Sequence, residues 1–209
     1  MVDALSNKLT LMIKMNVKDV DDEKAEIINY GLICFLSFIT KTIIILLVSY
    51  LLGILDLTVI AIVSLGFYRA FAGGAHANSH MICLFTSFII FLGPVYLGKF
   101  IFSLFSNIEI LYLFIFILNC VIIYYYAPAD VEQKPILSKN LRERLRMQSA
   151  FSMSLVIVLA LTIIKNHTIS NVLVATTLVE SITMIPLFYK LIGCKYGCRQ
   201  GSVPDIKQL

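Results

Sequence analysis

The sequence predicts an all-α, polytopic membrane protein with about six transmembrane helices and an amphipathic helix at its N-terminus. Two observations support this fold class: the composition and a series of long apolar stretches. Of the 209 residues, 59% are hydrophobic and only 14% are charged, whereas soluble domains average about 45–50% and about 25%. A soluble globule of this size cannot bury so much apolar surface in one core. A soluble enzyme or a free nucleic-acid binder is therefore a poor interpretation. We expect the lipid bilayer as a partner and no nucleic acid.

Residues 1–29 predict an amphipathic helix on a membrane surface. They lack the long apolar region that a cleavable signal peptide requires. Leu5, Leu9, Met12 and Ile13 recur at helical spacing, which gives the helix one apolar face. A frayed polar terminus is the alternative.

The apolar stretches that follow predict the membrane crossings. A spanning helix needs ~20 residues, with ~17 as the lower limit, so the second and fifth stretches are marginal. For the second, a partly broken or re-entrant segment is an alternative, because Arg69, Gly73 and Gly74 cut it short. We expect one membrane-embedded domain over residues 1–209, with a cytoplasmic N-terminus (1–29), a helical bundle (30–190) and a cytoplasmic tail (191–209). The six stretches are residues 30–53, 57–72, 81–104, 108–127, 149–165 and 168–190.

The distribution of Lys and Arg predicts the orientation, because these residues accumulate on the cytoplasmic side of membrane proteins. Six passes place both termini on one side, together with the 69–80 turn and the 128–148 loop. These segments hold most of the basic residues, while the opposite turns hold little beyond Lys165. We therefore expect both termini to be cytoplasmic.

Two charged residues, Lys41 and Glu180, lie within apolar stretches. A charge at that depth is costly, so each is expected to face the bundle interior or a wet cavity, or to pair with the other. These residues favour a second class of function, a non-enzymatic small membrane transporter or assembly subunit. Such a protein should tolerate Cys83→Ala.

Residues 69–83 concentrate reactive side chains between two membrane stretches, including two of the three histidines and a cysteine. One interpretation is a dyad that needs no cofactor, with Cys83 as nucleophile and His76 as base. Cysteine attacks as the thiolate, which a nearby imidazole favours. On one continuous helix the two residues would lie roughly 10 Å apart along the axis. The chain must therefore fold back between them, and Gly73–Gly74 permits a tight turn.

Two alternatives remain open for the same segment. His76, His80 and Cys83 have the spacing of zinc ligands on one helical face. However, no Glu follows His76 to complete the metalloprotease motif H-E-x-x-H. The histidines could also simply lie at the lipid headgroups.

The pattern Arg69, Gly74, His76 and Cys83, between two membrane segments, resembles the AgrB family. The stretch from Tyr125 to Asp130, with the basic run that ends at Arg146, is similar to the central cytoplasmic loop of that family. Length and hydropathy agree over essentially the whole chain.

The resemblance implies a membrane cysteine endopeptidase of bacterial quorum sensing, located in the cell membrane. Such an enzyme removes the C-terminal tail of a small AgrD-like propeptide and cyclises the rest, through an acyl-enzyme thioester, into a thiolactone or lactone. Carried over to this chain, Cys83 is the nucleophile and His76 the general base and acid. Gly74 would serve the turn, and Arg69 would face the acidic tail of the propeptide or the headgroups. The family also implies a homodimer.

The basic 128–148 loop adds an expectation about substrate binding. Clustered basic residues raise the local concentration of an acidic substrate, and the implied propeptide has an acidic tail. We expect this tail to be attracted by Lys139, Arg142, Arg144 and Arg146.

Overall fold

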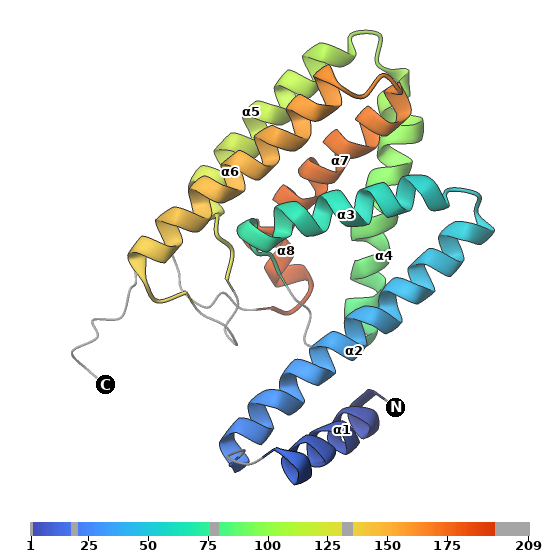
Figure 1. Cartoon of the computed structure of the whole chain (residues 1–209). Coiled ribbons are helices and arrows are strands. Elements are labelled where there is room, and N and C mark those ends of the chain that lie inside the picture. The colour runs from blue at the N-terminus through green and yellow to red at the C-terminus, as the bar shows by residue number, and fades with distance from the viewer. Residues whose placement is uncertain (1, 18–20, 76–79, 131–135, 195–209) are drawn as a thin grey trace. The chain divides into compact units, whose positions relative to one another are not determined.

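The computed structural model describes residues 2–17, 21–75, 80–130 and 136–194. Within these ranges every regular element is a helix (Figure 1), and the one β-type contact is an isolated bridge between Gly73 and Ala129. The predicted all-α fold class is confirmed. The elements are α1 (Val2–Asn16), α2 (Asp22–Leu51), α3 (Leu55–Ala72), α4 (His80–Tyr96), the π-helix η1 (Leu97–Ile101), the 3₁₀-helix η2 (Phe102–Leu104), α5 (Ile108–Tyr126), α6 (Lys139–Thr162), α7 (His167–Thr183) and α8 (Pro186–Leu191).

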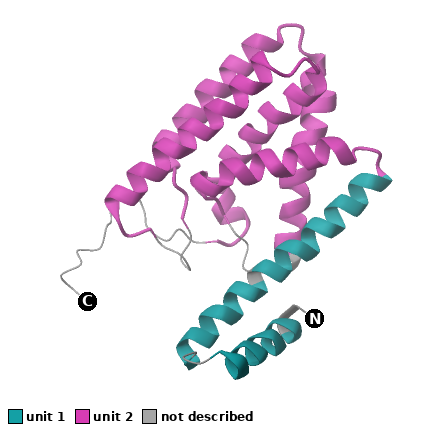
Figure 2. Ribbon diagram, viewed as in Figure 1, with its two compact units in different colours: residues 1–51 teal, residues 52–209 magenta. Residues whose placement is uncertain are grey.

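The chain divides into two compact units, residues 1–51 and 52–209 (Figure 2), which we call unit 1 and unit 2. Unit 1 is a hairpin of α1 and α2. Ser6 and Thr10 are buried and donate hydrogen bonds to Asn29 Oδ1 at 2.5 and 3.2 Å. The predicted N-terminal helix is therefore present, and its polar face packs on α2. Leu5 and Met12, each 48% exposed, point away and remain available to a membrane surface.

Unit 2 is organised around α7, which packs against α3, α4, η1, α5 and α6 (Figure 1). Most of its 17 residues are buried, and its seams with neighbouring helices include polar contacts. Tyr112 on α5 donates to Asn171 Oδ1 at 2.6 Å, and Asn119 donates to Thr177 Oγ1 at 3.0 Å. Such interhelical hydrogen bonds help to hold helices together where lipid removes the hydrophobic driving force.

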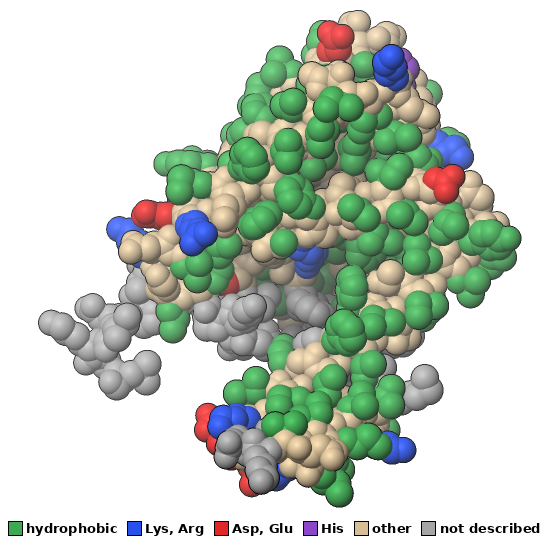
Figure 3. All heavy atoms as spheres, in the orientation of Figure 1, with side chains coloured by type: hydrophobic (Ala, Val, Ile, Leu, Met, Phe, Trp, Pro, Cys, Tyr) green, Lys and Arg blue, Asp and Glu red, His purple; other side chains and the backbone are tan. Residues whose placement is uncertain are grey.

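Five helices in the described part of the chain are long and apolar enough to cross a membrane. They are Asp22–Leu51, Leu55–Ala72, Ile82–Leu104, Ile108–Tyr126 and Lys139–Thr162. The marginal second stretch forms a continuous helix of 18 residues, α3. The sixth predicted stretch is divided into α7 and α8, with Pro186 at the start of α8. Figure 3 shows hydrophobic side chains spread along the helices with few charged side chains among them, as expected for helices in lipid.

One boundary needs correction: α6 begins at Lys139, whereas the sequence predicted a loop up to residue 148. The helix begins early because Ser138 caps it, its hydroxyl accepting a bond from the Leu141 amide at 3.4 Å. The first turns consist of good helix formers such as Leu, Arg and Lys, despite their low hydropathy. The four basic residues assigned to the loop therefore lie on the first two turns of a helix.

One end of unit 2 gathers segments that the charge pattern assigned to a single side of the membrane. Here α3, α5 and α7 end and α6 begins (Figure 1). The Gly74 amide donates to Ala129 O at 2.9 Å, and the Ala75 amide donates to Thr183 O at 3.4 Å. We call this the loop end, defined by residues 73–75, 127–130 and 183–194. Its grouping agrees with the predicted topology, in which all these segments share one side.

Candidate functional site

The segment that leads into His76 is held at the loop end by two glycines. Gly73 has φ +74° and Gly74 has φ +142°, values that disfavour side chains other than glycine. A Cβ at Gly73 would lie 2.2 Å from Ala129 O, and one at Gly74 would lie 2.9 Å from Thr183 Oγ1. Both positions therefore require glycine. The sequence indicated the turn, but nothing in it indicated the close approach to Ala129.

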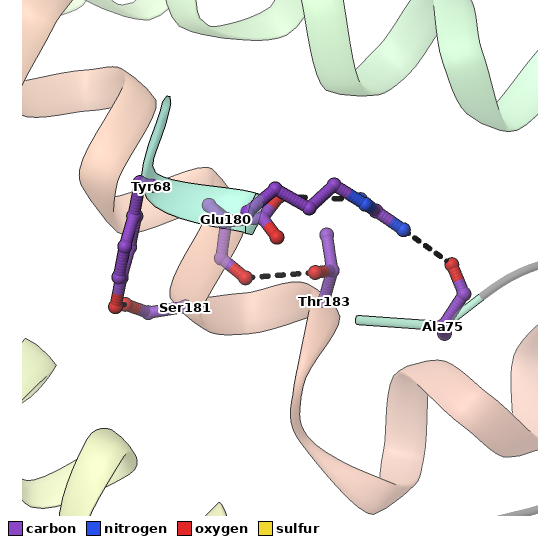
Figure 4. A network of polar contacts seen from close by, with 6 residues as sticks. Tyr68, Ala75, Glu180, Ser181 and Thr183 are labelled. Carbon is purple, nitrogen blue, oxygen red and sulfur yellow. Dashed lines mark hydrogen bonds and ion pairs between the residues drawn. The ribbon is translucent and has the colours of Figure 1, made fainter. Parts of the chain in front are cut away.

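Arg69, on the last turn of α3, joins this segment to α7 (Figure 4). Its Nη1 lies 3.2 Å from Glu180 Oε2, and its Nη2 donates to Ala75 O at 2.6 Å. The Glu180 side chain is fully buried and that of Arg69 is 28% exposed. The resemblance implies that Arg69 faces the substrate tail or headgroups, which stays a prediction. In the structure its guanidinium contacts Glu180 and Ala75 within unit 2.

One neighbouring hydrogen bond joins the end of α7 to the end of α3, and a second lies within α7 (Figure 4). The Tyr68 and Ser181 hydroxyls lie 3.0 Å apart, and both side chains are buried. Thr183 Oγ1 donates to the Glu180 backbone carbonyl at 2.8 Å. The Glu180 carboxylate, which the sequence places within an apolar stretch, thus has its partner on α3.

Cys83 is the fourth residue of α4, in the first turn of that helix, and it is a partly buried cysteine that forms no disulfide. The N-terminus of a helix favours an anion such as a thiolate. His76 lies outside the described residues, as does the side chain of His80. The dyad and the zinc alternative therefore both stay predictions. Among the residues that the structure describes, no group of three His, Cys, Asp or Glu side chains could hold a metal ion.

Of the four basic residues of α6, two contact the loop end and two are exposed. Arg142 Nη2 donates to Asp130 Oδ2 at 2.9 Å, and the Asp130 side chain is 1% exposed. Arg146 Nε donates to Ala127 O at 3.0 Å. Lys139 and Arg144, in contrast, are exposed. Two of the predicted tail-binding residues thus hold the loop end together, and two present their charge at the surface.

Asp130 was not singled out as a functional residue from the sequence. Besides the bond from Arg142, its carboxylate accepts a bond from the Ile136 amide at 3.0 Å, and its carbonyl accepts one from the Tyr189 hydroxyl at 3.0 Å. The sequence contains one indication, an acidic residue directly before a basic segment. If such an acid is buried it needs a partner, and a nearby basic residue can supply one.

Fold and site together define a class: a polytopic helical membrane protein with a cysteine at the start of a membrane helix, shortly after a glycine turn braced by an ion pair. The chain belongs to the accessory gene regulator B (AgrB) family, whose family model matches residues 6–184.

Curated relatives agree with this membership. The chain is 33% identical to a putative AgrB-like protein of Clostridium acetobutylicum, over 88% of this chain and 86% of the relative. It is 27% identical to protein FsrB of Enterococcus faecalis, over 86% and 74% respectively. It is 25% identical to accessory gene regulator protein B of Staphylococcus aureus, over 78% and 83%. No solved structure matches the chain.

Proposed function

We propose that this protein is a membrane cysteine endopeptidase that matures a quorum-sensing peptide. The substrate is a small AgrD-like propeptide, and the product is a cyclic thiolactone or lactone. One observation carries the proposal. The pattern Arg69, Gly74, His76 and Cys83 lies within the residues matched by the AgrB family, and its first two members brace the backbone that leads directly into His76.

The reaction assigns a role to each member of the dyad. His76 takes the proton of the Cys83 thiol, and the sulfur attacks the carbonyl carbon at the junction between signal segment and tail. The C–N bond breaks, His76 gives its proton to the departing amine, and the peptide stays on Cys83 as a thioester. A cysteine or serine within the peptide then attacks that thioester, which closes the ring and regenerates the Cys83 thiol.

The surroundings of Cys83 support the second step over hydrolysis. Cys83 lies within the candidate span Ile82–Leu104 rather than in a long polar loop. An apolar site that excludes water protects a reactive acyl intermediate. The internal nucleophile is held on the same chain as the acyl group, so it competes effectively with what water remains.

Cleavage assays on single variants test the proposal. Cys83→Ala and His76→Ala should each abolish cleavage of an AgrD-like propeptide. The double variant should be no worse than either single one, because residues that act as a unit are not additive. Cys120→Ala is the matched control, since Cys120 is a free thiol on α5 and should tolerate the change. Cleavage at the wild-type rate by the Cys83→Ala protein would contradict the proposal and favour the metal site at His76 and His80. No cleavage by the wild-type protein would favour the transporter or assembly subunit that uses Lys41 and Glu180.

A further inference from the structure

The ion pair between the partly exposed Arg69 and the fully buried Glu180 has a geometry that stability alone does not explain. Glu180 Oε1 is buried and accepts no hydrogen bond from the residues that the structure describes. A buried pair with an unsatisfied oxygen contributes little net stability, and well-packed apolar residues of similar volume often serve at least as well. An unsatisfied buried polar group in a folded protein calls for another reason to be there.

The second bond of Arg69 indicates that reason. The guanidinium is a planar fork, and fixing one of its nitrogens orients the others. Glu180 holds Nη1, and Nη2 then points at Ala75 O, 2.6 Å away. Ala75 directly precedes His76 in the chain. The carboxylate of α7 is thereby connected, through one side chain of α3, to the backbone that carries the proposed general base.

We propose that Glu180 is a positioning residue of the peptidase: it orients Arg69, which fixes the carbonyl of Ala75 and so the direction in which the chain enters His76. This inference rests on the proposed function. It also gives Gly74 a second task, because a Cβ there would lie 3.2 Å from the Arg69 guanidinium and push it aside.

The reactivity of Cys83 toward iodoacetamide, measured against pH, tests the inference without a peptide substrate. The protein carries Ala at the other four cysteines and is reconstituted in lipid vesicles. With His76 in place, the wild-type thiol should react at about pH 6, where an ordinary thiol is nearly inert. Glu180→Gln keeps the shape but removes the carboxylate charge, so Arg69 loses its ion pair and is held by a weaker hydrogen bond to the amide oxygen. Its reactivity profile should move toward higher pH, in the direction of the His76→Ala profile.

A double variant separates positioning from folding. Arg69→Met with Glu180→Met removes both charges and keeps apolar volume, so its thermal unfolding midpoint should not fall. Circular dichroism follows unfolding, because the chain has no tryptophan. The Cys83 reactivity profile of this double variant should nevertheless match that of His76→Ala. Propeptide cleavage should fall by about 100-fold, the effect of misplacing a reacting group by about 1 Å.

Tyr112→Phe is the matched control. This variant breaks the buried hydrogen bond from Tyr112 on α5 to Asn171 on α7. Asn171 lies on the same helix as Glu180, roughly 13 Å away along the axis. The variant should therefore leave the Cys83 profile unchanged. A wild-type profile and wild-type cleavage in the double variant would overturn the inference and leave the proposed function standing. A wild-type profile in His76→Ala would instead show that His76 does not activate Cys83. It would overturn both the proposed dyad and this inference.

Discussion

At the scale of single residues, Gly73 is the position where the structure leaves least freedom. Its left-handed backbone argues against a side chain, and so does the distance of 2.2 Å that would separate a Cβ from Ala129 O. A non-glycine residue in this conformation costs about 1–3 kcal/mol, and the contact adds to that cost. Gly73→Ala should lower the thermal unfolding midpoint, followed by circular dichroism, and reduce propeptide cleavage.

Gly66→Ala is the control for this prediction, because Gly66 lies within α3 and nothing lies within 4 Å of a Cβ there. Alanine in a helix interior is favoured over glycine by about 1 kcal/mol, so this variant should melt at the same temperature or higher. Equal behaviour of the two variants would contradict the close approach of Gly73 to Ala129.

Sequence reasoning identified the members of the site better than their partners. Arg69 and Gly74 stand out by pattern, and Glu180 stands out as a charge in an apolar stretch. Their pairing was not predictable, because Arg69 and Glu180 are 111 residues apart and hydropathy carries no information on which helix faces align. The expectation that Glu180 either pairs with Lys41 or faces a cavity reflects this limit.

At the scale of elements, the start of α6 carries two arginines that bind the loop end and two exposed basic residues that we expect to attract the substrate. Removing one partner of a buried ion pair leaves the other charge uncompensated, at a cost of about 3–5 kcal/mol. Arg142→Gln should therefore destabilise the protein strongly, since it removes the cation beside the buried Asp130 carboxylate. Arg144→Gln, at an exposed position two residues on, should change stability by no more than about 0.5 kcal/mol. Unfolding followed by circular dichroism compares the two variants, and equal stability would contradict the Asp130–Arg142 contact.

For the two exposed residues, Lys139 and Arg144, we expect an effect on propeptide cleavage rather than on stability. Reversing both charges to Glu should slow cleavage of a propeptide with an acidic tail. Exposed charges are screened beyond about 8–10 Å at moderate salt, so added salt should slow cleavage by the wild-type protein but not by the variant. Cleavage rates across a salt series measure this, and an unchanged series would limit these residues to a role in topology.

The helix boundaries show what hydropathy can and cannot predict. It located α3 and α5 within two residues at each end, because lipid-crossing helices are apolar throughout. It missed the polar first turns of α2 and α6, where capping and helix propensity rather than hydropathy extend the helix. It also did not predict the break at Pro186, which separates α7 from α8.

At the scale of the whole molecule, the loop end makes the predicted topology testable. Hydrogen bonds connect residues 72–75, 129 and 183, so the ends of α3, α5 and α7 lie together, and we expect them to share one side of the membrane. Reporter fusions at about residue 138 and at the C-terminus should read cytoplasmic, and fusions near 106 and 166 should read external. Fusions at 106 and 138 that read the same side would contradict the crossing of α5.

The central claim is that Cys83 forms a covalent thioester with the propeptide. Mass spectrometry of the protein, after mixing with a propeptide whose internal nucleophile is replaced by Ala, tests it most directly, because the cyclising step is then blocked. We expect release of the tail and a mass increase, equal to that of the remaining peptide, on the fragment that contains Cys83. The same mass increase on a fragment without Cys83, or tail release at the wild-type rate by the Cys83→Ala protein, would contradict it.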